Sequence, residues 1–277
     1  MKIVIYDPVG FDESQIASIR SAAGANDVVV SSKEQLATEL EQAEIFFGFH
    51  PPEVFQHAPH LRWIQVTSAG LDQILVPELV KRDLLISNAS GVYAPQVAEQ
   101  AWCLTLAIAG RVPHYWEEQK QHNWQAVDRI DLDGSTVGVI GLGGIGRRYS
   151  RVAAAFGMRV LAVDLHQPPK PDSVAALWSI DEIDQLLEQS DFVLVSCPYT
   201  SETHHLINAD RFSHMKSNAV LINIARGSIV DEQALVEALQ SGSIAAAGID
   251  VCEQEPLPPE SNLWDVPNLV ISPHCAG

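Results

Sequence analysis

The chain is poor in basic residues and cysteines, and it has no long apolar run. It has 17 lysines and arginines against 35 aspartates and glutamates among 277 residues, which gives a net charge of −18. Such a charge disfavours binding to nucleic-acid backbones and to anionic membrane surfaces, because both need basic patches. No uninterrupted apolar stretch approaches the ~20 residues that span a bilayer. We therefore expect neither a nucleic-acid partner nor a membrane partner.

The four cysteines form no CxxC pair, and no group of Cys, His and carboxylate residues has the spacing of metal ligands. The pair His204 and His205 suggests a metal only superficially, because adjacent residues on one backbone rarely bind the same ion. Each cysteine lies in or beside an apolar run, which predicts buried free thiols in a reducing compartment. The N-terminus enters a strand-like run at once and lacks the apolar region of a signal peptide. We expect a cytoplasmic protein without a metal.

Two series of apolar strands alternate with helical patterns, and the boundary between the series lies near Gly91–Pro95. The first series predicts strands at Ile3–Tyr6, Val28–Ser31, Ile45–Phe49, Trp63–Thr67 and Leu84–Ser87. The second series predicts strands at Val137–Ile140, Arg159–Val163, Phe192–Ser196, Val220–Ile224, Ala246–Val251 and Leu269–Ser272. Apolar strands between helices are typical of parallel sheets covered on both faces. The pattern predicts an α/β protein with two doubly wound parallel-sheet domains, residues 1–93 and 94–277.

A glycine-rich turn, GLGGIG, follows the first strand of the second series and precedes a helix expected to start near Arg147. In a dinucleotide site the first glycine makes the turn, the second admits the pyrophosphate, and the third lets helix pack on strand. The turn comprises Gly141, Leu142, Gly143, Gly144, Ile145 and Gly146. Asp164 ends the next strand, where a carboxylate can accept both ribose hydroxyls and would repel a 2′-phosphate. These features predict a dinucleotide site that favours NAD over NADP.

Several polar residues lie where strands of the second series end. Arg226 follows a strand at its carboxyl end, where open α/β sheets place ligands, and a guanidinium there can bind a carboxylate with two hydrogen bonds. His274 ends the last strand, and a nearby carboxylate would fix its tautomer and stabilise the imidazolium. Glu255 is the candidate for that carboxylate. Taken alone, each residue also has a purely structural explanation. Arg226 would close a strand end, Asp250 would cap a helix or a turn, and Glu255 would be a solvated side chain.

Together these motifs resemble the D-isomer-specific 2-hydroxyacid dehydrogenase family. The matching segments are SAGLD at 68–72, residues 96–99, GLGGIG, CPYTSET at 197–203, INIARGSIVDE at 222–232, GIDVCEQEP at 248–256 and SPHCAG at 272–277. They extend over nearly the whole chain. The resemblance implies a flavodoxin-like substrate-binding domain, a Rossmann NAD-binding domain, and hydride transfer between NAD(H) and C2 of a D-2-hydroxy acid or 2-keto acid.

The resemblance also implies roles for individual residues. Arg226 would bind the substrate carboxylate and carbonyl, His274 would be the acid/base, and Glu255 would be its partner. The substrate carboxylate would be received by the backbone of Ser68, Ala69 and Gly70. Cofactor contacts are implied for the glycine turn and for Asp164, Cys197, Pro198, Thr203, Ala225 and Asp250. The last of these would hold the nicotinamide carboxamide, and no metal is implied.

Several questions stay open at this point. An NAD(H)-sensing interaction protein, like the C-terminal-binding protein corepressors, is an alternative with the same fold, as is a phosphite- or formate-type dehydrogenase. Glyoxylate, hydroxypyruvate, pyruvate and bulkier keto acids all remain candidate substrates. The resemblance implies a homodimer through residues 94–124. It also implies a segment that returns to the first domain after the SPH motif. The sequence stops at Gly277 before such a segment, which was either removed or not recorded, or is lacking in this protein.

Overall fold

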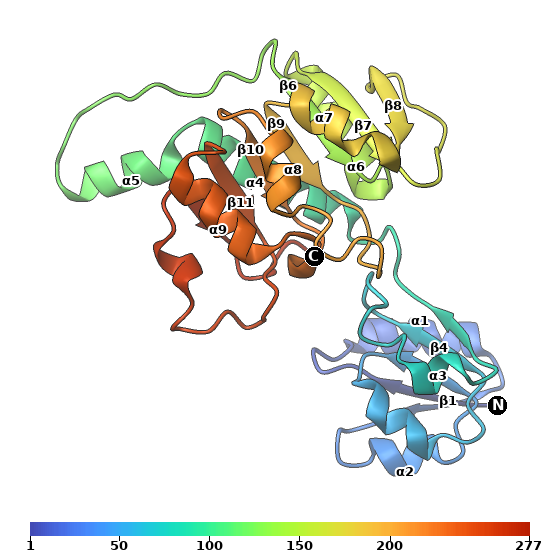
Figure 1. Cartoon of the computed structure of the whole chain (residues 1–277). Coiled ribbons are helices and arrows are strands. Elements are labelled where there is room, and N and C mark those ends of the chain that lie inside the picture. Colours follow the sequence, from blue (N-terminus) through green and yellow to red (C-terminus); the bar gives the residue numbers. More distant parts are fainter. The chain divides into compact units, whose positions relative to one another are not determined.

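The backbone separates into two units, Met1–Val92 and Tyr93–Gly277, in a computed structural model that describes all 277 residues (Figure 1). Each unit is built on one sheet of parallel strands, so the predicted α/β class with two parallel sheets is confirmed. None of the helices combines the length and the apolar character that crossing a bilayer requires.

Unit 1 contains five short strands and mostly short helices. The strands are β1 Lys2–Tyr6, β2 Asp27–Val30, β3 Ile45–Gly48, β4 Trp63–Val66 and β5 Leu85–Ser87. The helices are α1 Glu13–Ala23, α2 Leu36–Leu40, α3 Pro77–Val80 and the 3₁₀ helix η1 Pro52–His57. The strand order is β2-β1-β3-β4-β5, which is the flavodoxin-like order that the resemblance implied.

Local signals in the sequence explain how unit 1 begins and ends its elements. Asp12 caps α1, because its side chain accepts a hydrogen bond from the Gln15 N–H while the Gln15 side chain accepts one from Asp12. The buried face of the sheet contributes Val4, Phe46 and Ile64 to a core that the helices close. Phe46 meets Phe55 of η1 edge to face, with ring centroids 5.0 Å apart. The apolar strand residues therefore form one continuous core.

Unit 2 is larger. Its strands are β6 Thr136–Ile140, β7 Arg159–Asp164, β8 Ala176–Ser179, β9 Phe192–Val195, β10 Val220–Asn223, β11 Ala246–Ile249 and β12 Leu269–Ile271. Its α-helices are α4 Ala94–Ala109, α5 Val112–Lys120, α6 Gly144–Ala155, α7 Ile183–Gln189, α8 Ala209–His214 and α9 Glu232–Ser241. Its 3₁₀ helices are η2 Ile180–Glu182, η3 Gly227–Ile229 and η4 Asn262–Asp265.

The sheet of unit 2 has the order β12-β11-β10-β9-β6-β7-β8, and every pair is parallel. The strand order reverses between β6 and β9, which is the switch point where doubly wound sheets bind ligands. One core, which includes α4 and α6, packs on one face of the sheet, and a second core, which includes α7, α8 and α9, packs on the other (Figure 1). The predicted Rossmann architecture is thus confirmed.

Three details differ from the sequence predictions. The sheet of unit 2 has a strand that was not predicted, β8, whose residues are all only partly buried because it lies at the edge of the sheet. Helix α6 begins at Gly144 and not near Arg147. Two of the four cysteines, Cys103 and Cys275, are exposed, so the prediction of buried thiols was wrong for them.

Gly138 lies in the middle of β6, where any larger residue is expected to destabilise the fold. A Cβ at this position would overlap the side chains of Leu186 and Ser190, which come from α7 and the turn after it. Overpacking of this kind costs about 1–3 kcal/mol. We expect Gly138→Ala to lower the free energy of unfolding by that amount, measured by urea denaturation.

The matched control is Gly143→Ala. Gly143 has a φ of −76° and no atom within 4 Å of an added Cβ, so its replacement should leave the unfolding free energy nearly unchanged. Equal destabilisation by both variants would contradict the packing argument.

Candidate active site

The glycine-rich turn joins β6 to α6 at the switch point of the sheet. Gly141 has a φ of +93°, and an added Cβ would lie 2.7 Å from the backbone of Cys197, so glycine is required there. The hydroxyl of Ser196 donates to the Gly141 carbonyl at 2.8 Å. A Cβ on Gly146 would overlap that same carbonyl. The turn is therefore held tightly against the end of β9.

The other side of the turn is open. Gly143 and Gly144 are exposed, and no atom lies within 4 Å of a Cβ built on Gly143. Gly143 caps α6 without a side-chain hydrogen bond, so the first N–H groups of this 12-residue helix are not satisfied by a capping side chain. Unsatisfied N–H groups beside a side-chain-free backbone suit a bound pyrophosphate. The residues present thus fit a dinucleotide.

Asp164 at the end of β7 is tied to the glycine turn. One carboxylate oxygen accepts from the Leu142 N–H at 2.8 Å and the other accepts from the His166 N–H at 2.8 Å. Arg147, the first basic residue of α6, donates to the carbonyl of Leu142 at 3.1 Å and to that of Pro169 at 2.8 Å. The Arg147 guanidinium, which shares the Leu142 turn with Asp164, is thus held by backbone carbonyls.

The loop after β9 contains three of the predicted cofactor residues. Thr203 closes this loop, because its hydroxyl donates to the Pro198 carbonyl at 2.9 Å and accepts from the Thr200 N–H at 2.7 Å. Cys197 begins the loop against the glycine turn, and burial raises the pKa of its thiol to about 12. Thr203 thus shapes the loop, and Cys197 contributes a neutral, buried side chain.

Glu255 and His274 form the predicted pair. Glu255 Oε2 lies 2.6 Å from His274 Nδ1, and Glu255 Oε1 accepts from the Cys252 N–H at 2.9 Å. The His274 backbone has a φ of +50° and its N–H donates to the Asp250 carbonyl at 2.7 Å. Because Nδ1 is engaged by the carboxylate, Nε2 is the imidazole nitrogen left for a ligand. The His274 imidazole is half-exposed, so Nε2 is accessible to a ligand, as an acid/base requires.

Asp250 is buried, and its side chain binds the segment that ends the chain. Its side chain is 1% exposed and accepts from the Ser272 hydroxyl at 2.5 Å, from the Cys275 N–H at 3.2 Å and from the Ala276 N–H at 3.0 Å. Gln100 of α4 donates to the Ser272 hydroxyl at 2.9 Å. Gln100 and Ser272 were not predicted as site residues. The contact of Asp250 with a nicotinamide carboxamide stays a prediction.

Arg226 lies just beyond the carboxyl end of β10. Its Nη1 donates to the Ala225 carbonyl at 2.8 Å, while buried Asn223 donates from its amide to the Arg226 carbonyl at 3.0 Å and accepts from the Ala225 N–H at 3.1 Å. A Cβ on Gly227 would overlap the backbone of Cys252. This close approach brings the Arg226 turn against the loop that carries Glu255.

In unit 1, Ser68, Ala69 and Gly70 form a loop after β4. The Ser68 hydroxyl donates to the Gly70 carbonyl at 2.8 Å, and Asn88 donates from its amide to the Ala69 carbonyl at 2.6 Å. The loop is therefore ordered by its own contacts, and its binding of a substrate carboxylate stays a prediction.

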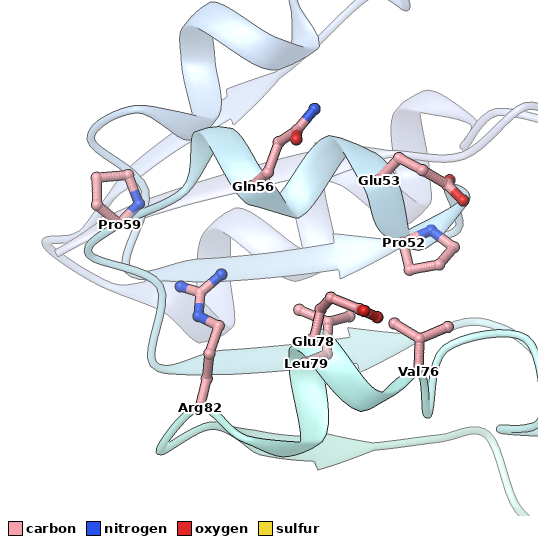
Figure 2. A pocket seen from close by; sticks show the side chains of 8 residues that line it. All are labelled: Pro52, Glu53, Gln56, Pro59, Val76, Glu78, Leu79 and Arg82. Carbon is pink, nitrogen blue, oxygen red and sulfur yellow. The ribbon is translucent and has the colours of Figure 1, made fainter.

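A hollow of about 580 Å³ also lies in unit 1, beside η1 and α3 (Figure 2). None of the predicted site residues lines it. The lining residues are Pro52, Glu53, Gln56, Pro59, Val76, Glu78, Leu79 and Arg82. The Arg82 guanidinium donates to the carbonyls of Phe55 and Ala58 at 2.9 and 2.5 Å, so its role there is structural. No group of three or more His, Cys, Asp or Glu side chains in the chain is arranged to hold a metal ion.

Comparison with known proteins places this geometry in context. The family model for the NAD binding domain of the D-isomer specific 2-hydroxyacid dehydrogenases matches residues 102–276. A glyoxylate reductase of Korarchaeum cryptofilum is 37% identical over 230 residues, which cover 81% of this chain and 69% of that protein.

Solved structures match over the full length of the chain. A D-isomer specific 2-hydroxyacid dehydrogenase family protein of Aeromonas salmonicida is 30% identical with a TM-score of 0.87, covering 100% of this chain and 89% of that one. A D-lactate dehydrogenase of Aquifex aeolicus, solved with NAD and lactic acid, is 28% identical with a TM-score of 0.80 and the same coverage. A Xanthobacter autotrophicus relative, 28% identical with a TM-score of 0.83 over 100% of this chain and 88% of that one, was solved with NADPH.

Buried and exposed cysteines are expected to differ in reactivity. Burial raises the pKa of the Cys197 thiol to about 12, and burial with the nearby carboxylates of Glu232, Glu255 and Asp250 raises that of Cys252 to about 12. The thiolate is the reactive form, and at pH 8 such thiols are ionised in roughly one molecule in ten thousand. Iodoacetamide should therefore label exposed Cys275, which lies outside residues 94–124, well before either of them, as measured by peptide mass spectrometry.

Unfolding in guanidinium chloride is the control, since all four thiols should then react at similar rates. Labelling of Cys197 in the native protein at the rate of Cys275 would show that the thiol is neither buried nor neutral.

Proposed function

The chain belongs to the D-isomer specific 2-hydroxyacid dehydrogenase family, and we propose that it transfers a hydride between NAD(H) and C2 of a small D-2-hydroxy acid or its 2-keto form. The observation that carries the proposal is the 2.6 Å contact between Glu255 and His274, in the same unit as an open glycine turn. A carboxylate–imidazole pair provides a proton, and the turn fits the cofactor.

The proposed roles divide between cofactor and protein. When bound, the nicotinamide supplies or accepts the hydride. In the reductive direction His274 Nε2 donates a proton to the carbonyl oxygen of the 2-keto acid, and Glu255 holds Nδ1 and stabilises the imidazolium. Arg226 binds the substrate carboxylate and stabilises the charge that develops on the oxygen. Each role is supported by the position of its residue at the carboxyl edge of the sheet of unit 2.

We propose that the substrate is a small 2-keto acid such as glyoxylate. The glyoxylate reductase at 37% identity and the structure of a D-lactate dehydrogenase with lactic acid support this size range. The net charge of −18 repels small acids at long range, so binding depends on a local cation. Arg226 would provide that cation.

We further propose a homodimer through residues 94–124 in the cytoplasm. The region around α5 exposes apolar side chains that a monomer would leave in water. They are Val112, Tyr115, Trp116 and Trp124, and the last of these is fully exposed. A partner surface that covers them would remove the largest aromatic side chains of this region from solvent.

His274→Ala is expected to lower kcat for reduction of glyoxylate by about a thousandfold, because the proton donor is lost. The dissociation constant for NADH, measured by fluorescence titration, should change less than about twofold, since the residue lies outside the glycine turn. His214→Ala, which removes a histidine that meets Glu188 away from the site, is the matched control, and it should keep full turnover. Retained turnover in His274→Ala, followed by NADH absorbance, would refute the proposed role.

Asp164→Asn is expected to shift the cofactor preference toward NADPH. The amide keeps an acceptor for a backbone N–H but removes the charge that would repel a 2′-phosphate, which should lower the ratio of kcat/KM for NADH over NADPH about tenfold. Arg147 is held by two carbonyls, so it should not compensate. Parallel assays with NADH and NADPH test this, and an unchanged ratio would mean that Asp164 does not set the preference.

A further inference from the structure

The position of Glu255 depends on the backbone of the loop that carries it. One of its oxygens is bound to the Cys252 N–H at 2.9 Å, and the other meets His274 at 2.6 Å. Any movement of the loop at Cys252 or Glu253 therefore moves the carboxylate relative to the imidazole. Contacts that fix Cys252 and Glu253 therefore also fix the proposed acid/base pair.

Two glutamates hold this loop to the start of α9. The Glu253 N–H donates to the Glu232 carboxylate at 2.5 Å, and the Glu232 N–H donates to the Glu253 carboxylate at 3.2 Å. This reciprocal arrangement places two negative groups near each other, with Asp231 and Glu255 close by. Burial raises the pKa of Glu232, and the charges of Glu253 and Glu255 raise it further. We call these two reciprocal hydrogen bonds the Glu232–Glu253 brace. The carboxylates of the brace repel each other, and a nearby cation would reduce this repulsion.

His205 is the basic side chain that meets this cluster. Its Nε2 lies 3.0 Å from Glu253 Oε1, and its Nδ1 lies 3.9 Å from Asp231 Oδ2. The ring stacks on His204 with centroids 4.0 Å apart. Its backbone is fixed as well, because the N–H donates to the Ser228 carbonyl at 2.8 Å. In the sequence analysis His205 was considered only as a metal ligand.

We propose that His205 is a positioning residue: its ring clamps Glu253 and, through the Glu232–Glu253 brace, holds the loop that keeps Glu255 on His274. The clamp consists of a hydrogen bond from Nε2 and, when the ring is protonated, of its charge against Glu253, Glu232 and Asp231. His205 itself touches neither substrate nor cofactor. The inference rests on the proposed function of His274, but the position of Glu255 can be tested without turnover.

The first test compares His205→Ala, His205→Gln and the control His214→Ala. His205→Ala should lower kcat about tenfold, because loss of orientation at the reacting groups costs rate, while the KM for NADH changes less than about twofold. The glutamine keeps an N–H donor for Glu253 and should recover most of the activity. His214 meets a different carboxylate, Glu188, at 3.2 Å, so His214→Ala should behave as wild type.

The second test follows the His274 imidazole by proton NMR in the resting protein, with its signal assigned by its absence in His274→Ala. In His205→Ala the ring-proton signals of His274 should shift and broaden, because Glu255 no longer holds the ring in one orientation. Unchanged signals overturn the clamp even if the enzyme turns over. Shifted signals in a protein that reduces no keto acid support the clamp and refute the proposed function instead.

A double-variant cycle guards against a general loss of structure. Glu253→Ala removes the acceptor that His205 holds, so adding His205→Ala on that background should cost less than about twofold in kcat, against about tenfold in the wild type. Independent, multiplicative effects of the two changes would overturn the proposal. Melting temperatures of all variants show whether any of them has lost its fold.

Discussion

Three neighbouring parallel strands that end at one edge of a sheet fix where the predicted catalytic residues of this protein lie. β10, β11 and β12 are paired in register, with Asn223 beside Ile249 and Ile249 beside Ile271. The residues that follow these three strands therefore lie at the same edge of the sheet, although they are up to fifty positions apart in the chain. The close approach of Gly227 to the Cys252 backbone then sets the spacing of the first two loops. Removing that contact would separate Arg226 from the loop that carries Glu255.

Much of this arrangement was predictable because it follows from local patterns. Apolar runs predicted eleven of the twelve strands, and the glycine turn predicted the junction of β6 and α6, because strand–turn–helix sequences have few physical solutions. The pair Glu255 and His274 was predicted from chemistry, since an imidazole at a strand end needs a carboxylate to orient it. The roles of these residues in a reaction remain predictions, as does the dimer.

What the sequence did not reveal depends on tertiary contacts. β8 is a partly buried edge strand, so it lacks the continuous apolar run by which the central strands were recognised. Gln100 meets Ser272 across 172 positions, and no local pattern anticipates such a pair. Cys103 lies in a largely apolar helix yet on its exposed side, which composition alone does not distinguish. The role proposed for His205 depends on its contact with Glu253, and only the fold brings these two residues together.

The loop from Pro198 to Thr203 closes on itself, since Thr203 bonds to Pro198 and Thr200 and not to a neighbouring element. Its conformation is therefore set by its own short sequence, while the two cores lie on the faces of the sheet behind it. A loop of this kind can be exchanged between relatives as a block, because its replacement does not require changes in the sheet that supports it.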